Sequence, residues 1–194
     1  MSPSIALPVF AAFALLLPAA PDRSRTTADV TATSEFGARL ERYLELRKEA
    51  LKSAPAIRKN AEPENVLARE KALAAMIRKA RVNARAGEIF TPAARKHFRA
   101  VTMAEVHDRG GAPVKETIKL GNPPADPEGA DVKLQVNGAY PKAAPKSTMP
   151  PSVLHRFPKL PPELEYRFVG RALILLDTAA NLIVDYAPEV GPAL

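Results

Sequence analysis

Apolar residues recur every three to four positions through much of the first half of the chain, which is the spacing of one buried helix face. Ser34 and Thr91 are N-capping residue types that precede two of these runs, and Gly87 follows another. Pro63 and Pro92 occupy positions that suit a first helical turn. These signals predict three helices, over residues 35–54, 62–86 and 92–107.

The second half of the chain has a different pattern, since 13 of the 20 prolines lie between Pro113 and Pro192. Long helices are therefore not expected there. Residues 108–130 are rich in Gly, Pro, Asp and Asn and predict a linker, with a short strand near 114–120. Alternation then predicts a strand over 132–136, and a pair of prolines precedes a short helix at 153–157.

The stretch LEYRFVGRALILLDTAANLIVDYAPE, residues 164–189, predicts a three-stranded antiparallel meander. A two-residue loop at Gly170–Arg171 and a four-residue loop at 178–181 fix its register. In that register Ile174 lies opposite both Arg167 and Asp185, and we expect these two charges to form a partly exposed pair across it. Asp177 and Asp185 then face opposite sides of the sheet. The apolar face comprises Tyr166, Phe168, Leu173, Leu175, Val184 and Tyr186.

The predicted fold class is α+β: an N-terminal helical segment of about three helices, then a small C-terminal antiparallel β-meander with a short helix packed on it. The corresponding segments are a signal peptide or anchor (1–20), a flexible segment (21–33), a basic helical region (34–107), a linker (108–130) and a small α/β-meander domain (131–194).

The N-terminal sequence contains an uncharged, largely apolar run from Ile5 to Leu17, followed by small residues at Ala19 and Ala20. This run has the length of a secretory signal core and is short for a membrane span, which needs about 20 residues. We expect export to the periplasm or the cell exterior, with cleavage after Ala19 or near Ala28. The alternative is a retained N-terminal anchor, through which alone the chain would contact a membrane.

Basic charge is concentrated in the helical half. Residues 35–100 carry 16 Lys or Arg against 8 Asp or Glu, whereas residues 101–194 carry 10 against 11. This imbalance is compatible with ordinary solvated helix faces and also with an anion-binding surface. The candidate anion-binding patch comprises Arg78, Lys79, Arg81 and Arg85 from the second helix, with Arg95, Lys96 and Arg99 from the third.

No catalytic, cofactor or metal signature is present. The chain has no cysteine, and it lacks the serine-hydrolase elbow, phosphate-loop, dinucleotide and zinc-protease motifs. Its three histidines, His97, His107 and His155, are scattered. We therefore predict a non-enzymatic protein that needs no cofactor and no metal.

The run from VNGAYP through MPPSVLHRFPKLPPELEYRFVGRALILLDTAANLIVDYAPE resembles the C-terminal domain of small exported bacterial proteins of uncharacterised function. It also resembles, more distantly, periplasmic proteins of the nickel/cobalt-homeostasis type. The resemblance covers about a third of the chain and implies a fold and an extracytoplasmic address. It transfers no metal ligand onto this sequence.

The expected function is binding of an unknown partner, protein or polymer, in the bacterial envelope. The alternative is binding of an anionic polymer, either nucleic acid or envelope polymer, through the basic helices. Aromatic residues for base stacking are scarce in those helices, so a nucleic acid would bind without sequence specificity.

Overall fold

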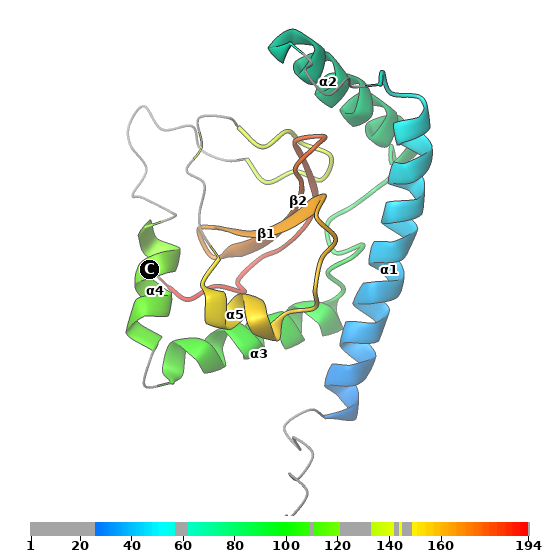
Figure 1. Ribbon diagram of the computed structural model, residues 1–194. Helices are drawn as coiled ribbons and strands as arrows, with labels where there is room; N and C mark the ends of the chain where they lie inside the picture. Colours follow the sequence, from blue (N-terminus) through cyan, green and yellow to red (C-terminus); the bar gives the residue numbers. More distant parts are fainter. Residues whose placement is uncertain are drawn as a thin grey trace, which may run out of the picture.

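The computed structural model describes residues 26–56, 62–108, 111–120, 133–141, 144 and 149–193. Helices come first along these residues and an antiparallel sheet comes last, so the predicted α+β class with a C-terminal meander is confirmed. Figure 1 shows α1 running along one side of the sheet, with α3 and α5 beneath it. The elements are α1 (Thr27–Lys52), α2 (Pro63–Ala80), α3 (Pro92–His107), α4 (Gly111–Leu120), α5 (Pro151–Arg156), β1 (Leu164–Val169), β2 (Ala172–Asp177) and β3 (Leu182–Ala187). The apolar N-terminal run lies outside the described residues.

Helix α1 begins before the predicted start. Thr26 caps it: its hydroxyl accepts a hydrogen bond from the Asp29 N–H at 3.2 Å, and the Asp29 carboxylate accepts one from the Thr26 N–H at 3.1 Å. The hydroxyls of Thr31 and Thr33 donate to carbonyls one turn earlier, so these threonines fit within the helix. The segment predicted to be flexible, 21–33, is therefore helical from Thr27.

Helix α2 ends at Ala80, six residues before the predicted end at Ala86. The chain leaves the helix there because the backbone of residues 87–90 hydrogen-bonds to the sheet. Helix α3 follows the prediction, with the Thr91 hydroxyl accepting a hydrogen bond from the Ala94 N–H at 3.3 Å.

Two segments differ from the predicted structure. Residues 111–120 form α4, where we predicted a linker with a short strand; Val114 and Ile118, one turn apart, are both buried. The strand predicted over 132–136 is absent from the described residues of that range. The adjoining residues lie along β3 instead, with the Asn137 N–H donating to the Ile183 carbonyl at 2.8 Å.

The three strands pair in the order β1-β2-β3, and both predicted loops are correct. Val169 lies opposite Ala172 across the Gly170–Arg171 turn, and Asp177 lies opposite Leu182. The register of β3 then shifts by one residue at a β-bulge, where Leu176 faces Ile183 and Leu175 faces Asp185.

The bulge moves several side chains to the opposite face from the prediction. Asp185 shares the face of Leu175 and is fully buried, while Tyr186 lies opposite Ile174 on the other face. The predicted Arg167–Asp185 pair does not form, because the bulge places the two side chains on opposite faces of the sheet; Arg167 pairs with Glu165 at 2.7 Å.

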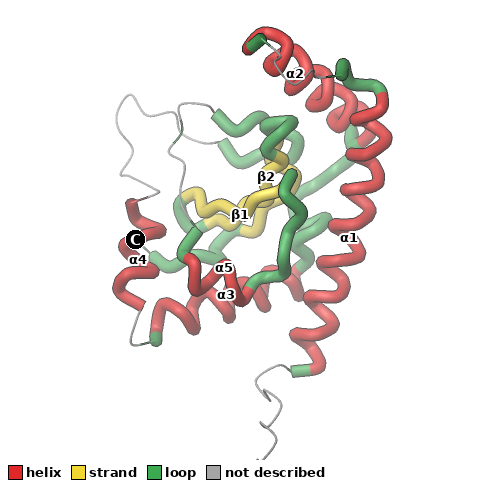
Figure 2. Tube along the Cα trace, viewed as in Figure 1, coloured by secondary structure: helices red, strands yellow, loops and turns green. Residues whose placement is uncertain are grey.

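The two faces of the sheet are covered by different parts of the chain (Figure 2). Helices pack on the face of Leu173 and Leu175, where one cluster contains residues from both the helical half and the meander. The opposite face, with Ile174 and Ile183, packs against residues that include Tyr140 and Ala144. The helix-covered core includes five aromatic rings in mutual contact: Phe36, Phe90, Phe98, Phe157 and Tyr166.

Candidate functional site

All seven cations of the predicted anion-binding patch lie in one segment of the chain, at the end of α2, in the loop that follows it and in the first turns of α3. Arg81 differs from the other six because it is only 8% exposed. Its guanidinium is engaged inside the protein, so the patch does not present it as an exposed charge.

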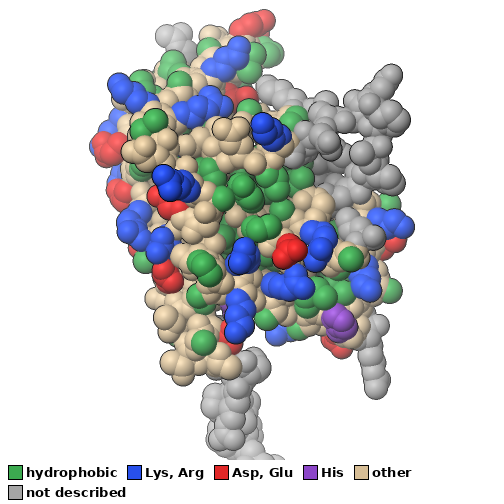
Figure 3. All heavy atoms as spheres, turned by 180° about the vertical axis from the view of Figure 1, so that it is seen from behind, with side chains coloured by type: hydrophobic (Ala, Val, Ile, Leu, Met, Phe, Trp, Pro, Cys, Tyr) green, Lys and Arg blue, Asp and Glu red, His purple; other side chains and the backbone are tan. Residues whose placement is uncertain are grey.

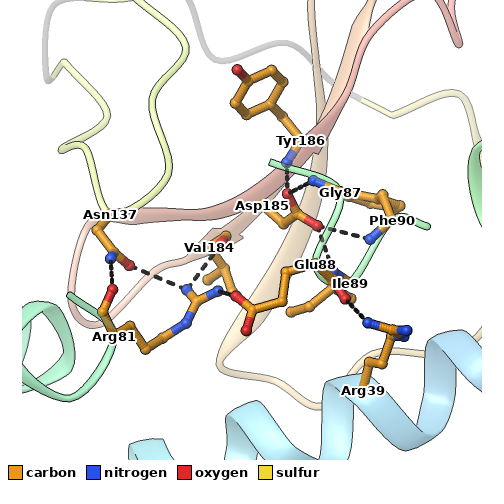
Figure 4. A network of polar contacts seen from close by, with 10 residues as sticks. All are labelled: Arg39, Arg81, Gly87, Glu88, Ile89, Phe90, Asn137, Val184, Asp185 and Tyr186. Carbon is orange, nitrogen blue, oxygen red and sulfur yellow. Dashed lines mark hydrogen bonds and ion pairs between the residues drawn. The ribbon is translucent and has the colours of Figure 1, made fainter. Parts of the chain in front are cut away.

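Arg81 connects the end of α2 to the sheet (Figure 4). One guanidinium nitrogen donates to the Val184 carbonyl at 2.9 Å and to the Asn137 side chain at 3.2 Å. The other terminal nitrogen donates to the Glu88 carboxylate at 2.9 Å. The guanidinium also lies over the Tyr43 ring, 5.2 Å from its centre. Arg81 is therefore held in one position by four groups.

The loop after Arg81 wraps around the carboxylate of Asp185 (Figure 4). One carboxylate oxygen accepts from the N–H groups of Gly87 and Tyr186, and the other accepts from those of Ile89 and Phe90, all at 2.7–2.8 Å. Burial raises the pKa of this carboxyl above its usual value, although the four N–H donors act in the opposite direction. Gly87 has a φ of 86°, which favours glycine, and this allows the loop to turn around the carboxylate.

A second buried carboxylate, Asp177, lies at the end of β2 on the same face of the sheet. It accepts from Arg47 Nε at 2.6 Å and from the Tyr43 hydroxyl at 2.7 Å, both on α1. The N–H groups of Ala179 and Ala180 donate to its other oxygen. Burial, with a further contribution from Asp177, raises the pKa of Tyr43 far above its usual value, so the phenol remains a donor.

Each aspartate is fully buried and bound by other groups, so neither presents its carboxylate at the surface. Asp177 lies on the predicted face of the sheet, whereas Asp185 was predicted to be partly exposed on the opposite face; that prediction is wrong, because the bulge in β3 brings Asp185 to the face of Asp177. An aspartate within an apolar strand is the sequence signal for a buried, hydrogen-bonded carboxylate, but the sequence does not identify the groups that bind it.

A cleft of about 310 Å³ lies between α1 and residues 80–89, next to these networks. Helix α1 contributes Arg39, Arg42, Tyr43 and Leu46; Arg39 and Tyr43, like Arg42 and Leu46, are four residues apart, so all four lie on one face. The other wall includes Arg81, Val82, Glu88 and Ile89. Three guanidinium groups and one carboxylate thus line the cleft, and its net charge is positive.

The arginines of the cleft differ in how they are engaged. Arg39 donates to the Glu35 carboxylate at 2.8 Å and to the Glu88 carbonyl at 2.7 Å. Arg42 is exposed and forms no hydrogen bond or ion pair within the described residues. Sequence reasoning did not assign Arg39 or Arg42 to a site, because the loop that brings Arg81 beside them was predicted to be helix.

The other six cations of the patch remain at the surface. Arg78 donates to the Asn137 carbonyl and Arg99 to the Glu189 carbonyl, and both are exposed. Over the described ranges, none of the six forms an ion pair with a carboxylate. Figure 3 shows the back of the molecule, where Lys and Arg side chains border a central apolar area.

A different polar contact joins the start of α1 to α3. His97 Nδ1 lies 2.8 Å from an oxygen of Asp29, and both residues line a cleft of about 700 Å³ with His155 and Arg156. Hydrogen bonds from Thr26 and the contact with His97 lower the pKa of Asp29 to about 2. His97, His155 and Asp29 line the same cleft but are not arranged to bind a metal ion together. In the part of the chain that the structure describes, no group of three His, Asp or Glu side chains is placed to hold a metal ion.

Comparison with protein-family models, curated proteins and solved structures finds no match. The resemblance of the C-terminal third to periplasmic nickel/cobalt-homeostasis proteins therefore stays a prediction. Among the helices of the described residues, none combines the length and the apolar character of a membrane span.

Proposed function

We propose that the protein is an exported, non-enzymatic binding protein that holds an acidic partner in the bacterial envelope. The observation that carries this proposal is the set of six exposed cations over residues 78–99, none of which has a carboxylate partner within the described residues. A partner with complementary negative charge would supply the missing ion pairs. We call these six residues the basic segment: Arg78, Lys79, Arg85, Arg95, Lys96 and Arg99.

Binding of this kind depends on salt. Exposed charges are screened over about 8 Å at physiological ionic strength, so affinity falls as salt rises. An acidic polypeptide and an anionic polymer both fit such a surface. We favour a polypeptide because the cleft beside the basic segment has apolar walls at Leu46, Val82 and Ile89, which contact side chains more readily than a bare polyanion.

The test compares two variants of equal charge. Lys79, Arg85, Arg95 and Lys96 are replaced by Gln in one, and Lys48, Lys115, Lys119 and Lys159 in the other. All eight side chains are exposed. Binding of poly-L-glutamate and of polyphosphate is measured at low and moderate salt. We expect the first variant to lose about tenfold or more in affinity for poly-L-glutamate and the second less than about threefold.

Equal losses in the two variants would show that net charge alone attracts the ligand, and an affinity independent of salt would also contradict the proposal. Stronger binding of polyphosphate than of poly-L-glutamate would favour the anionic-polymer alternative. Export is tested separately by cell fractionation, where a cytoplasmic product that retains Met1 would contradict it.

A further inference from the structure

The cleft between α1 and residues 80–89 contains a carboxylate site that is already formed. Arg81 is held by the Val184 carbonyl, the Asn137 side chain and the Tyr43 ring, and of these only Tyr43 lines the cleft. A guanidinium fixed in this way presents its remaining terminal nitrogen in a constant direction. That nitrogen binds the Glu88 carboxylate at 2.9 Å.

Glu88 is a weakly held occupant of this site. Its side chain is 50% exposed, whereas that of Arg81 is 6% exposed. Because half of the Glu88 side chain is in solvent, its ion pair is screened, and a second carboxylate can take its place on Arg81 at small cost. The buried guanidinium still requires an anionic partner, because leaving it unpaired is unfavourable.

The backbone of Glu88 stays in place when its side chain moves. Its neighbours Gly87, Ile89 and Phe90 are bound to the Asp185 carboxylate, and its own carbonyl accepts from Arg39. Exchange at Arg81 therefore needs a side-chain rotation and no rearrangement of the loop (Figure 4).

Arg42 supplies the attraction at the opening. It lies one turn before Leu46 on α1, is exposed, and has no partner within the described residues. A carboxylate entering the cleft thus meets Arg42 first and Arg81 inside, while Leu46, Val82 and Ile89 offer apolar contacts to the methylene groups behind it.

We infer that this cleft binds an acidic side chain of a polypeptide partner, whose carboxylate replaces that of Glu88 on Arg81. The inference rests on the proposed function and names the site within it. A carboxylate is favoured over a phosphate because the structure holds a carboxylate on Arg81 with suitable geometry.

The experiment measures binding of an end-blocked tetraglutamate peptide to the full chain by calorimetry. Glu88→Gln removes the competing charge and keeps the side-chain size, so we expect affinity to rise about threefold to tenfold. Arg42→Gln removes the charge at the opening, and we expect a fall of about the same size. Glu45→Gln and Lys48→Gln make the same charge changes at exposed positions of α1 outside the cleft, and should change affinity less than about twofold.

The inference is overturned if Glu88→Gln changes the affinity for the peptide no more than its control Glu45→Gln does. The same holds if Arg42→Gln changes it no more than its control Lys48→Gln does. If the basic-segment variant still weakens binding in that case, the proposed function stands without this cleft. If the wild type and Glu88→Gln both fail to bind tetraglutamate and poly-L-glutamate, both proposals fail. If Glu88→Gln raises the affinity for tripolyphosphate and not for the peptide, the group that binds Arg81 is a phosphate and not a carboxylate, which contradicts the inference. Thermal unfolding of each variant confirms that the fold is retained.

Discussion

Asp177 and Asp185 lie on the same face of the sheet and are both fully buried, yet the protein satisfies them in different ways. Asp177 is bound mainly by side chains of α1, with the positive charge of Arg47 2.6 Å away. Asp185 is bound by four backbone N–H groups and, within the described residues, has no cationic partner.

The difference shows two routes by which a carboxylate is kept in an apolar region. A side-chain partner balances the charge, but two ions then lose their water, and each depends on the other. Backbone donors require no second charge, but they need a loop with a particular shape. Asp177 therefore fixes α1 to the sheet, while Asp185 fixes the loop that carries Glu88 and forms one wall of the cleft.

The largest expected effect comes from removing Asp177. Asp177→Ala leaves Arg47, only 6% exposed, without its main partner, and should lower the free energy of unfolding by about 3–5 kcal/mol. Urea denaturation measures this change. A second variant separates charge from packing: Asp177→Leu together with Arg47→Met removes both ions and should be clearly more stable than Asp177→Ala. Equal destabilisation in the two variants would contradict the view that the unpaired cation dominates the loss.

Asp185→Asn should have a smaller but substantial effect. The amide oxygen replaces one acceptor, while the amide NH2 group faces N–H donors and cannot accept from them, so we expect a loss of about 2–4 kcal/mol. Amide hydrogen exchange gives a local readout, because Gly87, Ile89 and Phe90 should lose protection before the strands do. If Asp185→Asn lowers the free energy of unfolding by less than about 1 kcal/mol and leaves amide protection unchanged, Asp185 behaves as the partly exposed residue of the register predicted without a bulge. That result would contradict the observed hydrogen bonds.

The same two aspartates show how far the sequence determines this fold. The loops at Gly170–Arg171 and 178–181 were predictable because glycine, asparagine and the apolar alternation all agree there. The bulge at β3 was not, since alternation continues through it, and only the distant backbone of residues 87–90 reveals why Asp185 turns toward the helices.

The cleft, like the bulge in β3, depends on contacts between residues that are distant in the sequence, so it could not be predicted. The positive charge of residues 78–99 was evident from the sequence, but the regular pattern predicted that helix continued through Arg81 and Arg85. The loop forms there because its N–H groups bind Asp185, which is a contact between residues almost a hundred positions apart. Helix α4 was missed for a related reason, as Gly and Pro near its start indicated a linker, whereas burial of Val114 and Ile118 decides its structure.

The smallest expected effect concerns Asp29, an aspartate that is partly exposed and bound at the start of α1. Its lowered pKa, about 2, means that the folded protein favours the ionised form. Its stabilising contribution is therefore present above the usual carboxyl pKa and disappears as the pH falls from about 4 toward 2. Asp185 has the opposite sign: because its pKa is raised, its contribution declines as the pH rises above the usual value. Thermal unfolding of the wild type and of Asp29→Asn between pH 2 and pH 6 tests the contribution of Asp29, because Asp185 is the same in both proteins. The difference in midpoint should be largest at pH 5–6 and shrink steadily as the pH falls to 2, whereas a difference that stays constant with pH would show that Asp29 acts through helix capping alone, without its charge.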